Sequence, residues 1–207
     1  MTQIAEKSAK LATSAPAASL APEMLSHLAM VTHDAEATTD FYTRIMRMPL
    51  VAAVMHERIP STREIMPYLH LFFRMQDGST IAFFEGNGLP VREAPPHPMY
   101  DIFNHVALEV STVEQVDEWK AWVESNGIDV LGPVDHTIIY SIYFFDPNGI
   151  RLEITTPLTP DWNDRPDEAH EVVSAWLRTK HEALSSGADV KDALYRLVVG
   201  EEQARSK

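Results

Sequence analysis

The chain has 207 residues, of which 45% are hydrophobic, enough for one sizeable core or for two small modules that share one. Its formal net charge is -13 and it has no Lys/Arg-rich run, so nucleic acid and anionic membrane surfaces are poor partners. It has no cysteine, which excludes disulfides and thiolate metal sites and leaves His, Asp and Glu as metal ligands. No apolar run approaches the roughly 18 residues of a membrane-spanning helix.

The first 22 residues are rich in Ala, Ser and Pro and show no periodic apolar face. Lys7 and Lys10 precede small residues, as in a signal peptide, but Pro16 interrupts the segment that would form its apolar part. We therefore expect residues 1–22 to be a flexible tail and the protein to be cytoplasmic.

A strand followed by a helix is predicted twice. The apolar run LSHLAMVT (25–32) precedes an amphipathic helix that begins at Asp34. The run FNHVALEV (103–110) precedes a second helix, which Ser111 and Glu114 begin as a capping box.

A strand, a turn and a further strand also occur twice. Aligning the glycines of the DG and DPNG turns sets HLFFRMQDGSTIAFFE (70–85) over SIYFFDPNGIRLEITT (141–156). The sequence therefore predicts an α+β fold made of two βαβββ copies, at about 25–88 and 103–157.

Side-chain alternation assigns the polar strand residues to faces. His27 and His105 each stand near the start of the first strand of a copy. His105 points away from the apolar face formed by Val106, Leu108 and Val110. Glu153 likewise points away from the apolar residues Ile150, Leu152 and Ile154. We therefore expect the two histidines and Glu153 to lie on the faces that the helices do not cover.

A helical extension is predicted after the second copy. Pro166 begins a helix with one apolar stripe, and a second short helix is predicted at about 188–199, ending at Gly200. We expect a single domain at 23–158 and the extension at 159–207. The apolar stripe must be buried either on the modules or on a second subunit.

Three segments of the chain carry a family resemblance: HLAMVTHDAEATTDFYTRIMRMPLV, NHVALEV and above all SIYFFDPNGIRLEITT. They resemble the vicinal oxygen chelate superfamily, which includes glyoxalase I, bleomycin- and fosfomycin-resistance proteins and type I extradiol dioxygenases. The resemblance covers about residues 25–157 and implies a cup-shaped mixed sheet, a homodimer and metal ligands on the first and last strands of each module. Carried over to this chain, it implies that the ligands are His27, His105 and Glu153.

The family's fourth ligand position is informative in this chain. The repeat alignment places Ala82 opposite Glu153, where glyoxalase I-like enzymes have a carboxylate. Glu85 lies three residues further along and should point to the other face unless a bulge intervenes. Two imidazoles and one carboxylate form the site associated with non-heme Fe(II) oxygenases, so Fe(II) is expected, with Mn, Ni or Zn as alternatives.

Candidate catalytic residues follow from the same resemblance. Tyr143 stands ten residues before Glu153, as does the tyrosine that donates a hydrogen bond to the substrate in type I extradiol dioxygenases, although a core tyrosine is the alternative. His136 precedes that strand and is a candidate acid or base. His70 should face the cup, either behind the metal ligands or as a packed strand residue. The candidate pocket walls are Phe72, Phe84, Phe145 and Tyr140.

Three functions are compatible with these residues. The first is an Fe(II)-dependent extradiol-type dioxygenase that cleaves a catecholic or related aromatic substrate with O2. The second is a glyoxalase I-like lyase or isomerase with Ni, Zn or Mn, which needs Glu85 as a fourth ligand. The third is a metal-free, dimeric protein that binds a hydrophobic drug in its cup. The three-ligand set and Tyr143 favour the dioxygenase.

Overall fold

The computed structural model describes residues 22–91 and 93–205, so the expected tail at 1–22 lies almost wholly outside the described residues. The chain forms two compact units. One runs to Val134 and takes in Ser141–Thr156, and the other consists of Asp135–Tyr140 together with the chain from Pro157 onward. Among the described residues, no helix is long and apolar enough to cross a membrane.

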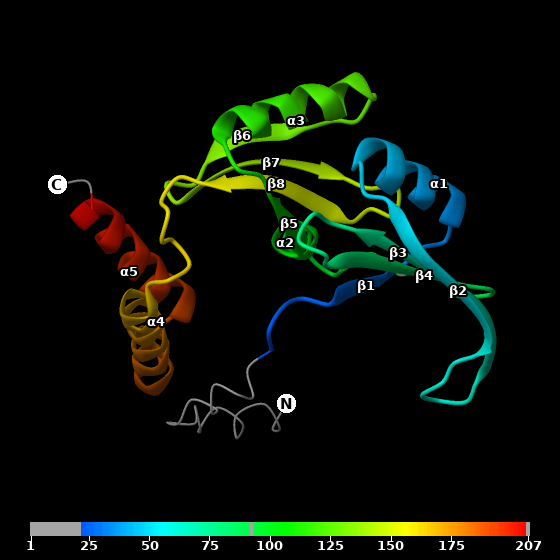
Figure 1. Cartoon of the computed structure of the whole chain (residues 1–207). Helices are drawn as coiled ribbons and strands as arrows, with labels where there is room; N and C mark the ends of the chain where they lie inside the picture. The colour runs from blue at the N-terminus through cyan, green and yellow to red at the C-terminus, as the bar shows by residue number, and fades with distance from the viewer. Residues whose placement is uncertain (1–21, 92, 206–207) are drawn as a thin grey trace. The chain divides into compact units, whose positions relative to one another are not determined.

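The first sheet is formed by the N-terminal copy of the repeat (Figure 1). Its strands lie in the order β1-β4-β3-β2, with β1 parallel to β4 and the other neighbours antiparallel. The strands are β1 (His27–Val31), β2 (Leu50–Arg58), β3 (Ile65–Arg74) and β4 (Thr80–Gly86).

The second sheet repeats this topology, with the order β5-β8-β7-β6 and β5 parallel to β8. Its strands are β5 (His105–Glu109), β6 (Leu131–Asp135), β7 (Ile139–Phe145) and β8 (Arg151–Pro157). In both copies the strand-joining turn contains a glycine with positive φ, at Gly78 (91°) and Gly149 (76°), a conformation that residues with a Cβ rarely adopt. The predicted α+β architecture of two four-stranded modules is confirmed.

The first helix packs on the first sheet. It begins as α1 (Ala35–Asp40), capped as predicted by Asp34, whose carboxylate accepts a hydrogen bond from the Ala37 N–H. It continues as a π-helical segment, η2 (Phe41–Ile45), that brings Tyr42 onto the sheet. The fully buried Tyr42 ring lies 5.2 Å from that of Phe73 and 4.9 Å from that of Phe83, measured between centroids.

The second module's helix differs from the prediction at its first turn. A short helix, α2 (Met99–Phe103), precedes β5, and α3 (Val113–Ser125) follows it. Thr112, not Ser111, caps α3, because its hydroxyl accepts from the Gln115 N–H while the Gln115 side chain accepts from the Ser111 N–H. The predicted Ser111–Glu114 capping box is therefore wrong by one residue.

The helical extension is longer than the sequence predicts. It consists of α4 (Pro166–Ser186) and α5 (Val190–Arg205). The prediction that the second helix ends at Gly200 is wrong, since α5 continues through this glycine, which costs about 1 kcal/mol of helix propensity relative to alanine. Within this unit the predicted stripe remains largely exposed at Val172, Val173 and Trp176.

The DPNG turn of the second module is hydrogen bonded to the first module. The buried Asp146 carboxylate accepts from the Tyr42 hydroxyl at 3.2 Å and from the backbone N–H groups of Asn148 and Ile150 at 2.8 Å. The Thr32 hydroxyl donates to the Asn148 side chain at 2.7 Å. These contacts hold the N-terminal end of β8, the strand that carries Glu153, against the first module.

Candidate metal centre

Glu153 occupies the middle of β8 and is 2% exposed. Its neighbours Leu152 and Ile154 are also buried, and both point to one face of the sheet. Strand alternation therefore places the Glu153 carboxylate on the other face, as predicted. A buried carboxylate is costly unless polar groups compensate it, and here both of its oxygens have partners.

His105 provides the first partner. Its Nε2 lies 2.9 Å from Glu153 Oε2, because β5 pairs in parallel with β8 and sets Ala107 opposite Glu153. Two atoms that bind one ion at about 2.1 Å and at a right angle lie roughly 3 Å apart, so this spacing suits adjacent metal ligands. The His105 side chain is 32% exposed, which leaves its edge open to an incoming ion.

Tyr143 provides the second partner. Its hydroxyl donates to Glu153 Oε1 at 3.0 Å, and its ring lies perpendicular to that of His105. Burial, followed by the nearby Glu153 charge, raises the pKa of Tyr143, so the hydroxyl keeps its proton at neutral pH and remains a donor. The structure thus brings together three predicted site residues of the second module.

His27 lies on the first sheet, apart from this cluster. It is exposed, and its ring centroid is 5.9 Å from that of Phe72 and 6.4 Å from that of His70. Within residues 22–91 and 93–205, no three His, Asp or Glu side chains are close enough to hold a metal ion. The structure therefore joins His105 to Glu153 but does not bring His27 to them within one chain.

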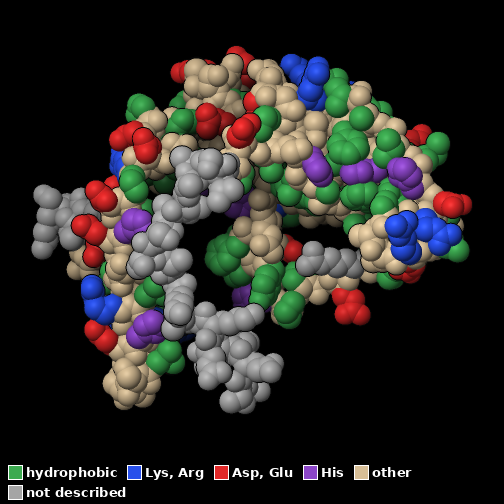
Figure 2. Space-filling view, turned by 60° about the horizontal axis from the view of Figure 1, so that its bottom comes forward, with side chains coloured by type: hydrophobic (Ala, Val, Ile, Leu, Met, Phe, Trp, Pro, Cys, Tyr) green, Lys and Arg blue, Asp and Glu red, His purple; other side chains and the backbone are tan. Residues whose placement is uncertain are grey.

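His70 is buried among aromatic rings on the same face as His27. Its ring stacks on Phe84 at a centroid distance of 3.6 Å, and its Nε2 is the one buried side-chain polar atom in the described part of the chain without a hydrogen-bond partner. Burial, and to a lesser extent the charge of His27, lowers the pKa of His70, so its imidazole is neutral at pH 7. Figure 2 shows histidine side chains lying among hydrophobic ones on one surface of the protein.

The register between β3 and β4 settles the orientation of Glu85. Phe72 pairs with Ala82, and Leu69 pairs with Glu85, without a register shift between these strands. Glu85 therefore shares the face of the buried residues Ile81 and Phe83, opposite to that of Ala82. The bulge that would turn Glu85 toward a metal at the predicted site is absent from this strand pair, and the requirement of a glyoxalase I-like site is not met.

A sequence profile described as the Glyoxalase/Bleomycin resistance protein/Dioxygenase superfamily matches residues 24–154. The chain belongs to this superfamily. The match spans both modules and confirms the resemblance inferred from the strand and turn motifs.

Solved structures of this superfamily resemble the chain at low sequence identity. A glyoxalase/bleomycin resistance protein/dioxygenase domain from Frankia sp. is 16% identical, with a TM-score of 0.51 over 66% of this chain and 99% of that one. A glyoxalase/dioxygenase from Nostoc punctiforme is 20% identical, with a TM-score of 0.50 over 72% and 99%. The fosfomycin resistance protein FosX from Listeria monocytogenes, complexed with Mn(II) and sulfate, is 23% identical, with a TM-score of 0.47 over 68% and 97%. At these identities the likeness to the Frankia and Nostoc structures shows the fold alone.

The remaining predicted residue, His136, lies in the turn between β6 and β7. It is exposed, and its backbone N–H donates to the Ile139 carbonyl at 2.9 Å. Its predicted acid or base role in this superfamily member stays a prediction. Arg151, two residues before Glu153 on β8, contacts the site directly: its guanidinium lies 4.2 Å from the centre of the Tyr143 ring.

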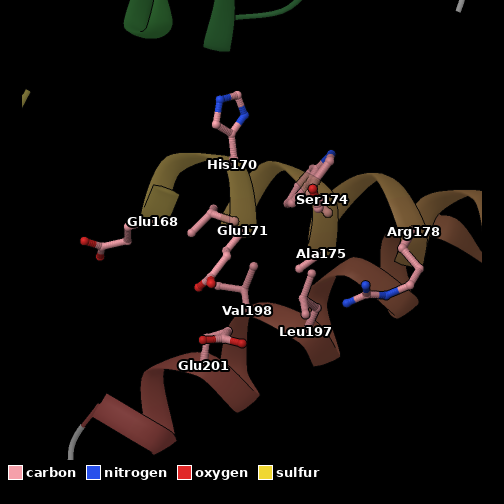
Figure 3. A pocket seen from close by; sticks show the side chains of 11 residues that line it. Glu168, His170, Glu171, Ser174, Ala175, Arg178, Leu197, Val198 and Glu201 are labelled. Carbon is pink, nitrogen blue, oxygen red and sulfur yellow. The ribbon is translucent and has the colours of Figure 1, made fainter. Parts of the chain in front are cut away.

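A pocket with a volume of about 770 Å³ lies between α4 and α5 (Figure 3). The carboxylates of Glu168, Glu171 and Glu201 gather toward one end of it and Arg178 lies toward the other. It contains none of the predicted site residues. A smaller pocket of about 510 Å³ at one end of the first sheet is lined by His33, His56 and Glu85, among other residues.

Proposed function

We propose that the chain is a metal-dependent, extradiol-type dioxygenase that cleaves a catecholic or related aromatic substrate with O2. The observation that carries the proposal is the contact of one buried carboxylate, Glu153, with His105 at 2.9 Å and with Tyr143 at 3.0 Å. On this sheet, a ring-cleaving site would use two adjacent metal ligands and a protonated phenol beside them that can donate a hydrogen bond to the substrate.

The donor set fits a divalent ion of intermediate softness. His27, His105 and Glu153 would hold it, and with no cysteine in the chain the set is imidazole and carboxylate only. Fe(II) is the proposed metal, with Mn, Ni or Zn as alternatives, and it would supply the Lewis acidity and the redox chemistry that insert both atoms of O2 into the ring. Three protein ligands leave positions for a diol and for O2.

Two further residues have proposed roles in substrate handling. Tyr143 keeps its proton and donates a hydrogen bond that Glu153 accepts in the metal-free chain and a substrate oxygen can accept in the complex. His70 presents a neutral imidazole whose Nε2 has no partner, on the face that also carries Phe72 and Phe84. These aromatic rings suit a flat, apolar substrate.

We also propose that the active form is a homodimer. The lone chain does not gather His27 with His105 and Glu153 among its described residues. A second copy would bring the first sheet of one subunit against the second sheet of the other and so complete two equivalent sites.

The test is metal analysis followed by a substrate survey. Protein loaded anaerobically with Fe(II) is expected to bind one ion per chain, to consume O2 with a subset of catechols and to form yellow ring-cleavage products. Full iron occupancy without turnover of any aromatic diol would overturn the dioxygenase assignment. Natively purified protein that neither contains nor takes up a divalent metal would favour the drug-binding alternative.

A further inference from the structure

Arg151 is a buried cation on the face that carries the proposed metal ligands. It stands two residues before Glu153 on β8, so both side chains point the same way, and it pairs with His105 across the β5–β8 ladder. It is 9% exposed in a chain whose net charge is -13.

The contacts of Arg151 leave most of its donors unused. One guanidinium nitrogen donates to the Ile102 carbonyl at 3.1 Å, and the guanidinium lies over the Tyr143 ring. Among the described residues, Arg151 makes no ion pair with a carboxylate. The carboxylate on its own strand face, Glu153, already has both oxygens engaged by other side chains.

The unused donors are still within reach of solvent. An arginine has five N–H groups, and one nitrogen accounts for the hydrogen bond to Ile102. Among the described residues, the one side-chain nitrogen or oxygen that is buried without a hydrogen-bond partner is His70 Nε2. The guanidinium nitrogens of Arg151 that make no hydrogen bond are therefore not fully buried, and they contact solvent. A small ligand entering the site can therefore reach them.

The charge balance of the face calls for an anion. Burying a guanidinium without a counter-ion is costly, and the stack on Tyr143 and one carbonyl offset only part of that cost. The Glu153 charge is not available to Arg151, because the proposed metal uses it. With a divalent ion bound, the charges of the ion, Arg151 and Glu153 sum to a net positive value.

We infer that Arg151 binds a carboxylate on the substrate, so that the substrate class is an aromatic diol that carries a carboxylate side chain. A planar guanidinium held flat on an aromatic ring keeps its edge donors in one orientation, which suits a bidentate pair with a planar carboxylate. This inference rests on the proposed function, because it places the diol at the metal of the same face.

The experiment compares a catechol that carries a carboxylate with an uncharged analogue of the same catechol. Fe(II)-loaded protein is assayed with 3,4-dihydroxyphenylacetate and with its methyl ester, which lacks the negative charge of the side chain and is larger by one methyl group. The wild type should prefer the acid by about 10–100-fold in kcat/KM, the effect of one charge-assisted bidentate contact. In Arg151→Met the ratio of kcat/KM for the acid to that for the ester should fall to near one, mainly through a raised KM for the acid, and Arg151→Lys should keep part of the preference.

Arg47 offers a matched control, since its guanidinium also stacks on an aromatic ring, that of Trp122, at 4.4 Å. Arg47→Met should keep the full preference for the acid. Direct binding of 4-hydroxyphenylacetate, measured by calorimetry on Zn-loaded protein, gives a readout without turnover and should be lost in Arg151→Met.

Each outcome decides one of the two proposals. Turnover of catechols with no preference for the acid in the wild type, or an unchanged preference in Arg151→Met, overturns the role of Arg151 and leaves the dioxygenase assignment standing. Arg151-dependent binding of the carboxylate without turnover supports the role of Arg151 and removes the dioxygenase. If Arg151→Met does not fold, the role of Arg151 is decided by the ratio of kcat/KM for acid and ester, measured in the wild type and in Arg151→Lys.

Discussion

His70 and Glu153 are both buried, titratable strand residues, but their polar side-chain atoms differ in whether they have hydrogen-bond partners. Glu153 accepts two contacts from side chains, whereas His70 Nε2 has none. An unsatisfied buried polar atom costs about 1–3 kcal/mol, and a fold that retains one has a stability deficit at that position. His70→Phe should therefore raise the free energy of unfolding of the metal-free protein by about 1 kcal/mol and lower kcat, measured by urea unfolding and by the catechol assay. A variant that is less stable and fully active would show that His70 is a packing residue; His56→Phe, at an exposed position of the same sheet face, is the control.

Glu153 should be indispensable for metal binding. Glu153→Gln keeps the shape and an acceptor for Tyr143 but removes the charge, so metal affinity should fall by more than the roughly 10–100-fold that loss of an outer-shell partner costs. Chelator competition measures this affinity. Glu85→Gln changes a carboxylate on the opposite face and should leave the affinity unchanged. Retained stoichiometric metal in Glu153→Gln would remove the proposed ligand set.

At the scale of elements, the DPNG turn joins the two modules through the hydrogen bond from Tyr42 to Asp146. Burial, the largest effect, raises the pKa of Asp146, and its hydrogen bonds oppose that rise. A carboxyl with a raised folded-state pKa is stabilising below its unfolded pKa of about 3.9, and this contribution is lost as the pH rises through the folded pKa. Tyr42→Phe removes one donor to the carboxylate, so the pKa of Asp146 should rise further and more stability should be lost.

The stability deficit of Tyr42→Phe should therefore grow with pH. It should be small near pH 4 and reach about 1–3 kcal/mol at pH 7, as measured by urea unfolding across this range. Tyr100→Phe, at an exposed position on α2, should show no such trend. A deficit that is constant from pH 4 to pH 8 would mean that the hydrogen bond does not depend on the ionisation of Asp146.

Strand faces could be predicted from sequence because alternation has a period of two and the glycine turns fix where each strand begins. The faces of Glu153 and Glu85 followed from this rule. Helix ends could not be predicted as well, because Ser111 with Glu114 and Thr112 with Gln115 both satisfy the capping pattern and only the backbone conformation selects the second pair. The contact between Tyr143 and Glu153 depends on the pairing of strands, which side-chain pattern alone does not specify.

At the scale of the whole molecule, sequence alternation says which face a residue occupies but not which two faces meet. His27 lies on the first sheet with His70, and the pair of His105 and Glu153 lies on the second. Since no three such side chains come together within the described residues of one chain, the centre proposed above would take His27 from the first sheet of a second copy. An isologous dimer of this kind would hold two sites, each with His27 from one subunit and the pair from the other.

Subunit mixing tests this arrangement. His27→Ala and Glu153→Ala should each bind no metal, but in their mixed dimer one site lacks both ligands and the other is intact. Random mixing should therefore restore metal to about a quarter of the sites, measured as bound metal per chain after unfolding and refolding the two variants together. His105→Ala mixed with Glu153→Ala should restore none, because these two ligands come from the same module and stay in one chain. Mixed dimers of His27→Ala and Glu153→Ala that remain without metal would place all three ligands in one subunit and would require the two sheets of a single chain to close on each other.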